Sequence, residues 1–114
     1  MNRSSQSPAR FAAVLGLLVC SMAVAAAAAP KPKTHTVTID GTRFQTADLS
    51  VARGDIVVWV NQDPFPHTVT SKAGGFDSQT IDAGKSWKYT AVKRGEFPYV
   101  CNFHPMMSGT LRVK

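Results

Sequence analysis

The chain has 114 residues, of which 44% are apolar, 18% are charged and 9% are aromatic. This length fits one domain with a leader and excludes a multidomain enzyme, while the composition excludes a disordered or collagen-like chain. Two cysteines, Cys20 and Cys101, are too few for a disulfide scaffold, and the formal net charge of +6 depends for its meaning on where the charges lie.

Residues 1–29 differ in composition from the rest of the chain. Two arginines precede a long apolar run that ends in an alanine tract before Pro30. A positive start, an apolar stretch and small residues at its end predict a Sec-type signal peptide over residues 1–29, cleaved near Ala28/Ala29. The alternatives are an uncleaved membrane anchor, since the run approaches the length of a spanning helix, and a lipoprotein modified at Cys20. All three place the following domain outside the cytoplasm.

The remaining domain, residues 30–114, carries a moderate and scattered positive charge. Its 11 Lys and Arg residues exceed its 7 Asp and Glu residues by 4, and the basic residues form no continuous block. Nucleic-acid binding calls for a concentrated basic stripe, so we expect no nucleic-acid partner. We also expect no membrane contact once the leader is cleaved. The residual positive field favours an acidic partner.

The predicted elements of this domain are all strands. Residues 56–60 form a nearly continuous apolar run, which predicts a buried central strand. Helical periodicity is absent, apart from a possible turn near residues 73–79. Short strands separated by turn signals predict a β-sandwich or barrel, and Trp59 and Trp87 are expected in its core. The other predicted strands cover residues 36–39, 49–51, 67–70, 86–90, 96–101 and 109–113.

Four soft or borderline metal donors are concentrated in one short segment and one distant histidine. Cys101, His104 and Met107 follow the spacing C-x2-H-x2-M directly after a predicted strand, and His67 begins another strand. Where these strands are neighbours, one thiolate, two imidazoles and one thioether converge at one end of the sheet. Two His and one Cys with a weak axial Met form the blue-copper arrangement, and soft sulfur donors favour copper over iron, manganese or zinc. The sequence therefore predicts one type 1 copper ion.

Each proposed ligand also has an ordinary structural interpretation. Cys101 could be a small buried apolar residue, His104 an exposed loop residue, and Met106 or Met107 a filler of the core. Removing the metal site requires such coincidences at all the proposed ligands together. The Met106-Met107 doublet leaves the axial donor ambiguous, although a turn at Pro105 favours Met107. His35 has no donor near it in the sequence, so we expect no metal role for it.

These segments resemble the cupredoxin (blue copper protein) family, most of all its amicyanin and plastocyanin branch. The resemblance implies an all-β, cupredoxin-like Greek-key β-sandwich of about eight strands, and single-electron transfer in the periplasm. It also implies that the copper ligands are His67, Cys101, His104 and Met107. The ligand loop has the short amicyanin length. The matching segments are Gly54–Asn61, Pro66–Val69, Tyr99–Met107 and Gly109-Thr110.

Two further features lie beside the predicted ligands. Thr68 and Asn102 differ from the residues that family members often carry after the first His and the Cys. We interpret them as a hydrogen-bonding pair that ties the two ligand segments together, the alternative being two unrelated polar loop residues. An apolar rim around His104 is expected to serve as a docking surface, or else to be ordinary loop packing. The residues of this rim are Phe65, Pro66, Phe103, Pro105 and Met106.

The sequence thus predicts a monomeric periplasmic electron carrier. No general base, nucleophile or substrate pocket is visible in the sequence, so we expect no enzyme activity. The expected partners are redox proteins, namely a dehydrogenase, a c-type cytochrome or an oxidase. The main alternative is a periplasmic copper-binding protein for copper sequestration or delivery, because Met106 beside Met107 suits an exchangeable thioether site. A third alternative is a metal-free structural sandwich.

Overall fold

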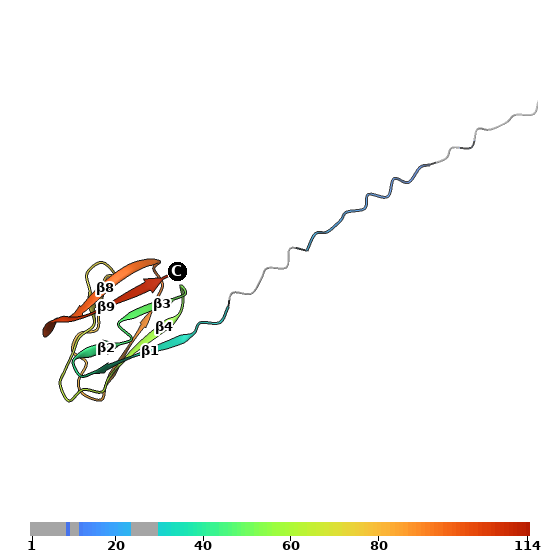
Figure 1. Ribbon diagram of the computed structural model, residues 1–114. Helices are drawn as coiled ribbons and strands as arrows, with labels where there is room; N and C mark the ends of the chain where they lie inside the picture. The colour runs from blue at the N-terminus through green and yellow to red at the C-terminus, as the bar shows by residue number, and fades with distance from the viewer. Residues whose placement is uncertain (1–8, 10–11, 24–29) are drawn as a thin grey trace, which may run out of the picture.

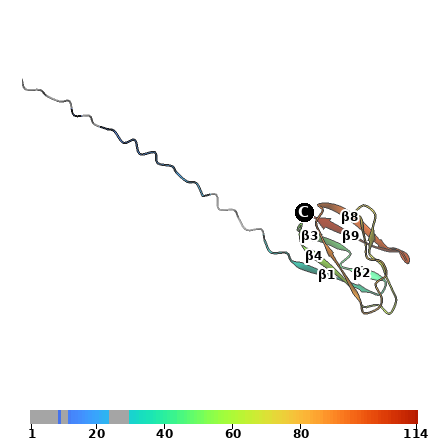
Figure 2. The same cartoon turned by 180° about the vertical axis from the view of Figure 1, so that it is seen from behind.

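The computed structural model describes residues 9, 12–23 and 30–114, and Figures 1 and 2 show it from two opposite sides. The predicted cleavage site near Ala28/Ala29 lies outside these residues. Within the described ranges, no helix has the length and apolar character needed to cross a membrane.

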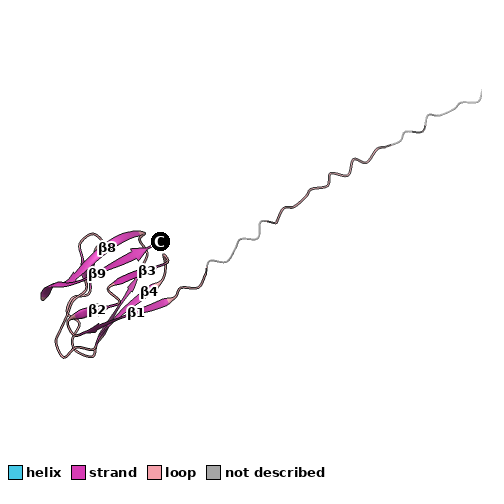
Figure 3. Ribbon diagram, in the orientation of Figure 1, coloured by secondary structure: helices cyan, strands magenta, loops and turns pink. Residues whose placement is uncertain are grey.

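Residues 34–113 fold into two mixed β-sheets. In Figure 3 this part of the chain consists of strands and the loops that join them. The first sheet has the strand order β2-β1-β4-β7 and the second has the order β3-β9-β8-β5-β6. The described residues therefore contain nine strands where about eight were expected. The first sheet consists of β1 (Thr34–Asp40), β2 (Arg43–Gln45), β4 (Ile56–Asn61) and β7 (Ser86–Thr90). The second consists of β3 (Asp48–Val51), β5 (Thr70–Ser71), β6 (Phe76–Asp77), β8 (Gly95–Cys101) and β9 (His104–Val113).

The core lies between the inner faces of the two sheets. Strand β4 is central, as predicted, and alternates: Val57, Trp59 and Asn61 are buried, whereas the residues between them are only half-buried. This alternation is typical of a strand with one face on the core and one toward solvent. Trp59 is fully buried, and Trp87 packs against it with ring centroids 5.6 Å apart. The expected core position is confirmed for Trp59, while Trp87 is half-buried and packs against the core.

The segment after His67 differs from its prediction. Residues 67–70 were expected as one strand, but β5 covers only Thr70–Ser71, and His67 forms an isolated bridge with Ile81. The possible helical turn near residues 73–79 is wrong. A glycine turn there, in which Gly75 adopts φ +66, reverses the chain so that β5 pairs with β6. Phe76 can then bury its ring against the core, which a surface turn would not allow.

The strand directions sort the connections into two ends of the sandwich. The β4–β5 loop and the β8–β9 turn lie at one end. The other end, which we call the basal pole, gathers residues 30–35, 51–55, 91–96 and 112–114. In Figure 1 the described chain enters the sandwich close to the C-terminus, whereas the β8–β9 turn projects at the opposite end.

Candidate metal centre

Three of the four predicted ligands lie together at the end of the sandwich opposite the basal pole. His67 is in the β4–β5 loop, Cys101 is the last residue of β8, and His104 is the first residue of β9. One donor atom from each lies within 4.8 Å of the other two. The Cys101 Sγ atom is 3.7 Å from His67 Nδ1 and 3.9 Å from His104 Nδ1. The prediction that sequence-distant donors meet at one sheet end agrees with this placement.

The β8–β9 turn brings Cys101 and His104 face to face. These two residues are direct partners in the antiparallel register, and the register shifts between Val100 and Cys101. Such an irregularity bends a strand and re-aims its side chains. The segment after Cys101 is therefore a tight hairpin whose second strand begins at His104. This strand, β9, is longer than the strand predicted over residues 109–113.

The two methionines of the doublet face opposite ways. The Met107 side chain is buried with 4% exposure, whereas Met106 is 96% exposed. Adjacent residues of a strand point to opposite faces, so β9 turns Met107 inward and Met106 outward. The predicted turn at Pro105 is wrong, because the turn lies at Asn102-Phe103 and Pro105 is already part of β9. The expected inward orientation of Met107 is nevertheless present and comes from the alternation of the strand.

His67 is fixed by a carboxylate that the sequence analysis did not single out. Its Nε2 atom lies 2.7 Å from Asp63 Oδ2, and both side chains are buried. A carboxylate only accepts hydrogen bonds, so the neutral ring carries its proton on Nε2 and keeps a free lone pair on Nδ1. The Nδ1 atom is the one that faces Cys101. Metal-binding histidines commonly donate their other ring N–H to a carboxylate in this way.

Asp63 is itself held by the turn between β1 and β2. The backbone N–H groups of Gly41 and Thr42 donate to its two oxygens at 2.7 and 2.8 Å. Burial alone raises the pKa of the Asp63 carboxyl, but the hydrogen bonds from Thr42, His67 and Gly41 outweigh it, so the pKa lies below the ordinary value of 3.8. The carboxylate therefore stays ionised beside His67. The spacing Asp-x3-His was the available sequence signal, but its partners at Gly41 and Thr42 are distant in sequence.

Thr68 links the two ligand-bearing segments. Its backbone N–H donates to Cys101 Sγ at 3.3 Å, and its hydroxyl accepts the backbone N–H of Asn102 at 2.9 Å. The prediction that Thr68 ties the two ligand segments together is therefore confirmed. Asn102 contributes its backbone N–H to this tie, and its side chain is exposed.

The predicted apolar rim consists of exposed residues on the two segments that carry His67 and His104. Phe65 is 60% exposed and Phe103 is 50% exposed, although large aromatic side chains usually lie inside a domain. All five residues predicted for this rim are exposed, and they come from the β4–β5 loop and the β8–β9 hairpin: Phe65, Pro66, Phe103, Pro105 and Met106.

The donor set fits a soft or borderline metal ion. Cys101 is a free cysteine with no exposed surface, and a thiolate so placed is a strong ligand for copper. Two imidazole Nδ1 atoms approach the thiolate sulfur, and one of these rings is already in the tautomer that ligation needs. The chemistry of this set suits a Cu(II)/Cu(I) ion more than a hard, oxygen-seeking ion such as magnesium or calcium.

Comparison with known proteins gives consistent matches. Residues 10–113 match the model of a cupredoxin-like domain. Amicyanin from Paracoccus versutus is 29% identical over 83 residues, which cover 68% of this chain and 63% of that amicyanin. Amicyanin from Paracoccus denitrificans is similar to the same degree. The chain thus spans a little under two thirds of the length of these relatives.

Solved structures give the same match at the level of the fold. A reduced amicyanin variant superimposes with a TM-score of 0.64 at 28% identity, covering 69% of this chain and 80% of the amicyanin. A copper-containing nitrite reductase from Thermus scotoductus superimposes with a TM-score of 0.66 at 31% identity, covering 81% of this chain and 24% of the reductase. The all-β Greek-key sandwich predicted from the sequence is confirmed.

Proposed function

The chain belongs to the cupredoxin-like domain family, and from this premise we propose that it is a periplasmic type 1 copper protein that shuttles single electrons between redox proteins. The observation that carries the proposal is the cluster of His67 Nδ1, Cys101 Sγ and His104 Nδ1 within 4.8 Å. Amicyanin and other similar proteins support the same function, since cupredoxins of this kind use copper for electron transfer.

In this proposal each ligand has a separate role. His67, Cys101 and His104 would hold one copper ion through two imidazole nitrogens and a thiolate, and Met107 would add a weak thioether donor. Bound copper would supply the Cu(II)/Cu(I) couple for one electron. His67 and Cys101 are buried and held by Asp63 and Thr68, so these contacts would keep both ligands in place when the copper changes oxidation state.

His104 is proposed as the route by which the electron leaves. Its ring is the solvent-accessible member of the cluster, and two residues of the apolar rim, Phe103 and Pro105, are its neighbours in the chain. A small apolar surface suits the short-lived complexes of electron carriers. The expected partners are a dehydrogenase, a c-type cytochrome or an oxidase, and the protein would act as a monomer.

A carrier role is proposed in preference to an enzymatic one. A pocket formed by the described residues lies at the basal pole, lined by segments around Lys33, Arg53 and Lys114. A substrate bound there would be separated from the three donor atoms by the length of β8, which runs from the basal pole to Cys101. Residues 1–29 are proposed as the export signal, cleaved near Ala28/Ala29, which would deliver the cupredoxin domain of residues 30–114 to the periplasm.

Voltammetry of the copper-loaded protein tests the carrier proposal. We expect one reversible one-electron wave, with fast electron exchange at a hydrophobic electrode surface. Met106→Lys should slow this exchange because it places a charge in the rim, while Lys88→Gln, on the exposed face of β7, should leave it unchanged. An irreversible wave, or loss of copper on reduction, would contradict the proposal.

Copper sequestration or delivery is the second candidate, and one observation favours it. Met106 exposes its thioether almost completely beside the cluster, where it could receive or release Cu(I). Transfer of copper from the reduced protein to a Cu(I) chelator separates the candidates. Rapid transfer that is slowed by Met106→Leu would support delivery, and retention of copper through repeated redox cycles would support the carrier.

A further inference from the structure

The charges of the domain are divided unequally between its two ends. The basal pole has seven basic and two acidic side chains, whereas the rest of residues 30–114 has four basic and five acidic ones. The net side-chain charge is therefore +5 at the pole and −1 in the rest of the domain. The basic residues of the pole are Lys31, Lys33, Arg53, Lys93, Arg94, Arg112 and Lys114, and its acidic residues are Asp55 and Glu96.

Backbone hydrogen bonds join the segments of this pole into one surface. Arg53 N donates to the Lys114 carbonyl at 3.1 Å, and Ile56 N donates to the Lys33 carbonyl at 2.8 Å. Gly54 N donates to the carbonyl of Ala91 at 2.7 Å, which fixes the β7–β8 loop beside the β3–β4 turn. The basic residues therefore share one rigid surface although they are far apart in the sequence.

The two acidic side chains of the pole are already engaged. Asp55 is buried and accepts hydrogen bonds from Lys33 N, Ala52 N and His35 Nε2, at 2.9 to 3.1 Å. Glu96 lies 3.3 Å from Arg112. Among the described residues, the other six basic side chains of the pole pair with no carboxylate, and all six are exposed.

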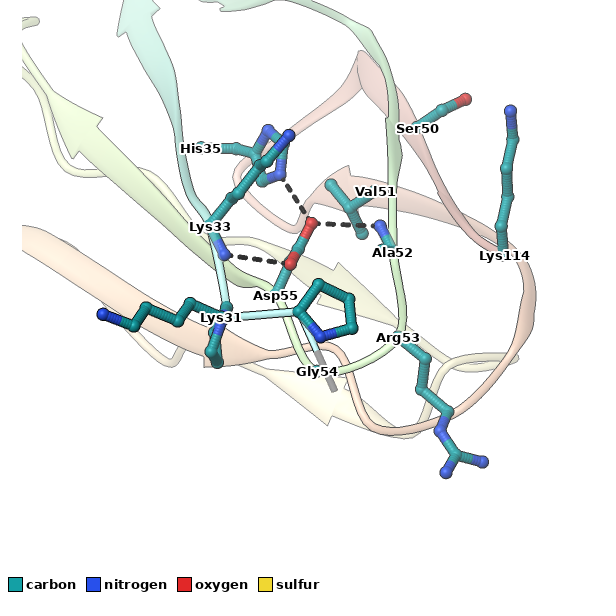
Figure 4. Close-up of a pocket in the computed structure, with 12 residues that line it drawn as sticks. Lys31, Lys33, His35, Ser50, Val51, Ala52, Arg53, Gly54, Asp55 and Lys114 are labelled. Carbon is teal, nitrogen blue, oxygen red and sulfur yellow. Dashed lines mark hydrogen bonds and ion pairs between the residues drawn. The ribbon is translucent and has the colours of Figure 1, made fainter. Parts of the chain in front are cut away.

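The cations point outward and do not converge on the pocket between them. In Figure 4 Asp55 lies at the centre of the pocket with its three hydrogen bonds, while the ends of Lys31, Arg53 and Lys114 extend away from it in different directions. A small anion seated in the pocket would find one buried carboxylate and no converging donors. A broad anionic surface, in contrast, would meet all the cations together.

One observation favours a membrane over an acidic protein as that surface. Val92 is 66% exposed in the same loop as Lys93 and Arg94, so an apolar side chain accompanies the charges. We propose that the basal pole binds the headgroups of an anionic phospholipid membrane and thereby holds the cluster end of the domain away from the membrane, facing soluble partners.

This association is peripheral and electrostatic, and it needs no spanning segment. It modifies the expectation that the domain has no membrane contact after cleavage of its leader. The pole and His104 lie at opposite ends of β9, so the pole would orient the molecule while the rim exchanges electrons.

Cosedimentation of the exported, copper-loaded protein with vesicles tests this proposal. The vesicles contain either phosphatidylcholine alone or phosphatidylcholine with a minority of phosphatidylglycerol. We expect binding to the anionic vesicles only, weakened by added salt. The triple variant Lys31→Gln, Arg53→Gln, Lys114→Gln should bind about a hundredfold more weakly, at about fivefold per charge.

The matched control removes the same net charge elsewhere, by Arg43→Gln, Lys72→Gln and Lys85→Gln, and should keep most of the affinity. Equal weakening by both triple variants would overturn the proposal, because net charge alone would then explain binding. Binding to a polyglutamate peptide but not to vesicles would also overturn it and would indicate an acidic protein partner. The visible spectrum of each loaded variant is recorded in parallel, so a failure of the copper site is distinguished from a failure of the pole.

Discussion

Asp63 determines which face of His67 is available at the metal centre. Its carboxylate accepts a hydrogen bond from Nε2, with the two atoms 2.7 Å apart, and is anchored in turn by the backbone of the β1–β2 turn. A ring held in this way cannot rotate Nδ1 away from Cys101. An ionised carboxylate behind the ring also makes its nitrogen a stronger donor.

Asp63→Asn is therefore expected to weaken copper binding by about 10- to 100-fold, the range typical for partners of metal-binding histidines. It should also raise the reduction potential, because a weaker imidazole donor stabilises Cu(II) less. Competition with a chelator and voltammetry measure the two effects. Asp40→Asn, an exposed carboxylate on β1, is the matched control. Unchanged affinity in Asp63→Asn would contradict the role given to Asp63.

The two methionines allow a paired test of the axial ligand. Met107→Leu should raise the reduction potential by removing a weak donor to Cu(II), and should cost less than about 1.5 kcal/mol of stability because the swap conserves volume. Met106→Leu should leave the potential unchanged, since that side chain is exposed. The reverse pattern would assign the axial position to Met106.

Among the elements, the β4–β5 loop and the β8–β9 hairpin are joined by Thr68. Thr68→Val keeps the shape of the side chain but leaves the Asn102 N–H without its acceptor. We expect a loss of about 1–3 kcal/mol in the free energy of unfolding of the copper-free protein, measured by urea denaturation. Asn102→Ala keeps the backbone donor and should change stability by no more than about 0.5 kcal/mol. A large effect of Asn102→Ala would show that the tie depends on its side chain.

Strand β1 is attached to the β3–β4 turn through Asp55. The backbone N–H of Lys33, the His35 ring and the backbone N–H of Ala52 lower the pKa of this carboxyl from 3.8 to about 2. Because the pKa is lower in the folded state, the ionised carboxylate stabilises the fold in full when the pH is above the pKa of the unfolded chain. That contribution is lost as the pH falls from 3.8 to about 2.

The melting temperature of the wild-type protein should therefore exceed that of Asp55→Asn by a constant amount near neutral pH. The gap should narrow as the pH falls through the same acid range. Thermal unfolding of the copper-free proteins, followed by circular dichroism, measures it. A gap that is independent of pH down to 2 would contradict the role of the Asp55 charge.

Elements with a strong local pattern were predictable, and those set by tertiary pairing were not. The apolar run of residues 56–60 matches β4, because burial of alternate side chains fixes such a strand wherever it lies. Strand β2 has three residues, and β5 and β6 have two each, which is too short for a recognisable alternation of apolar and polar residues. They exist because β1 and β8 supply pairing edges.

For the molecule as a whole, the donors of the site were readable from sequence but their supports were not. Cys101 and His104 are close neighbours along the chain, and the unusual lone thiol drew attention to them. Asp63 and Asp55 act through partners about 20 residues away, namely Thr42 and His35. Only the fold reveals such contacts, and the same is true of the basic residues of the basal pole, which look scattered in the sequence.

The central claim, a copper ion held by the Cys101 thiolate, is tested most directly by the visible spectrum during titration with Cu(II). We expect an intense thiolate-to-copper charge-transfer band that saturates at a single copper ion per chain. We expect no such band in Cys101→Ser, while circular dichroism shows that the variant remains folded. A colourless copper complex of the wild-type protein, or an unchanged band in Cys101→Ser, would contradict copper binding by the Cys101 thiolate.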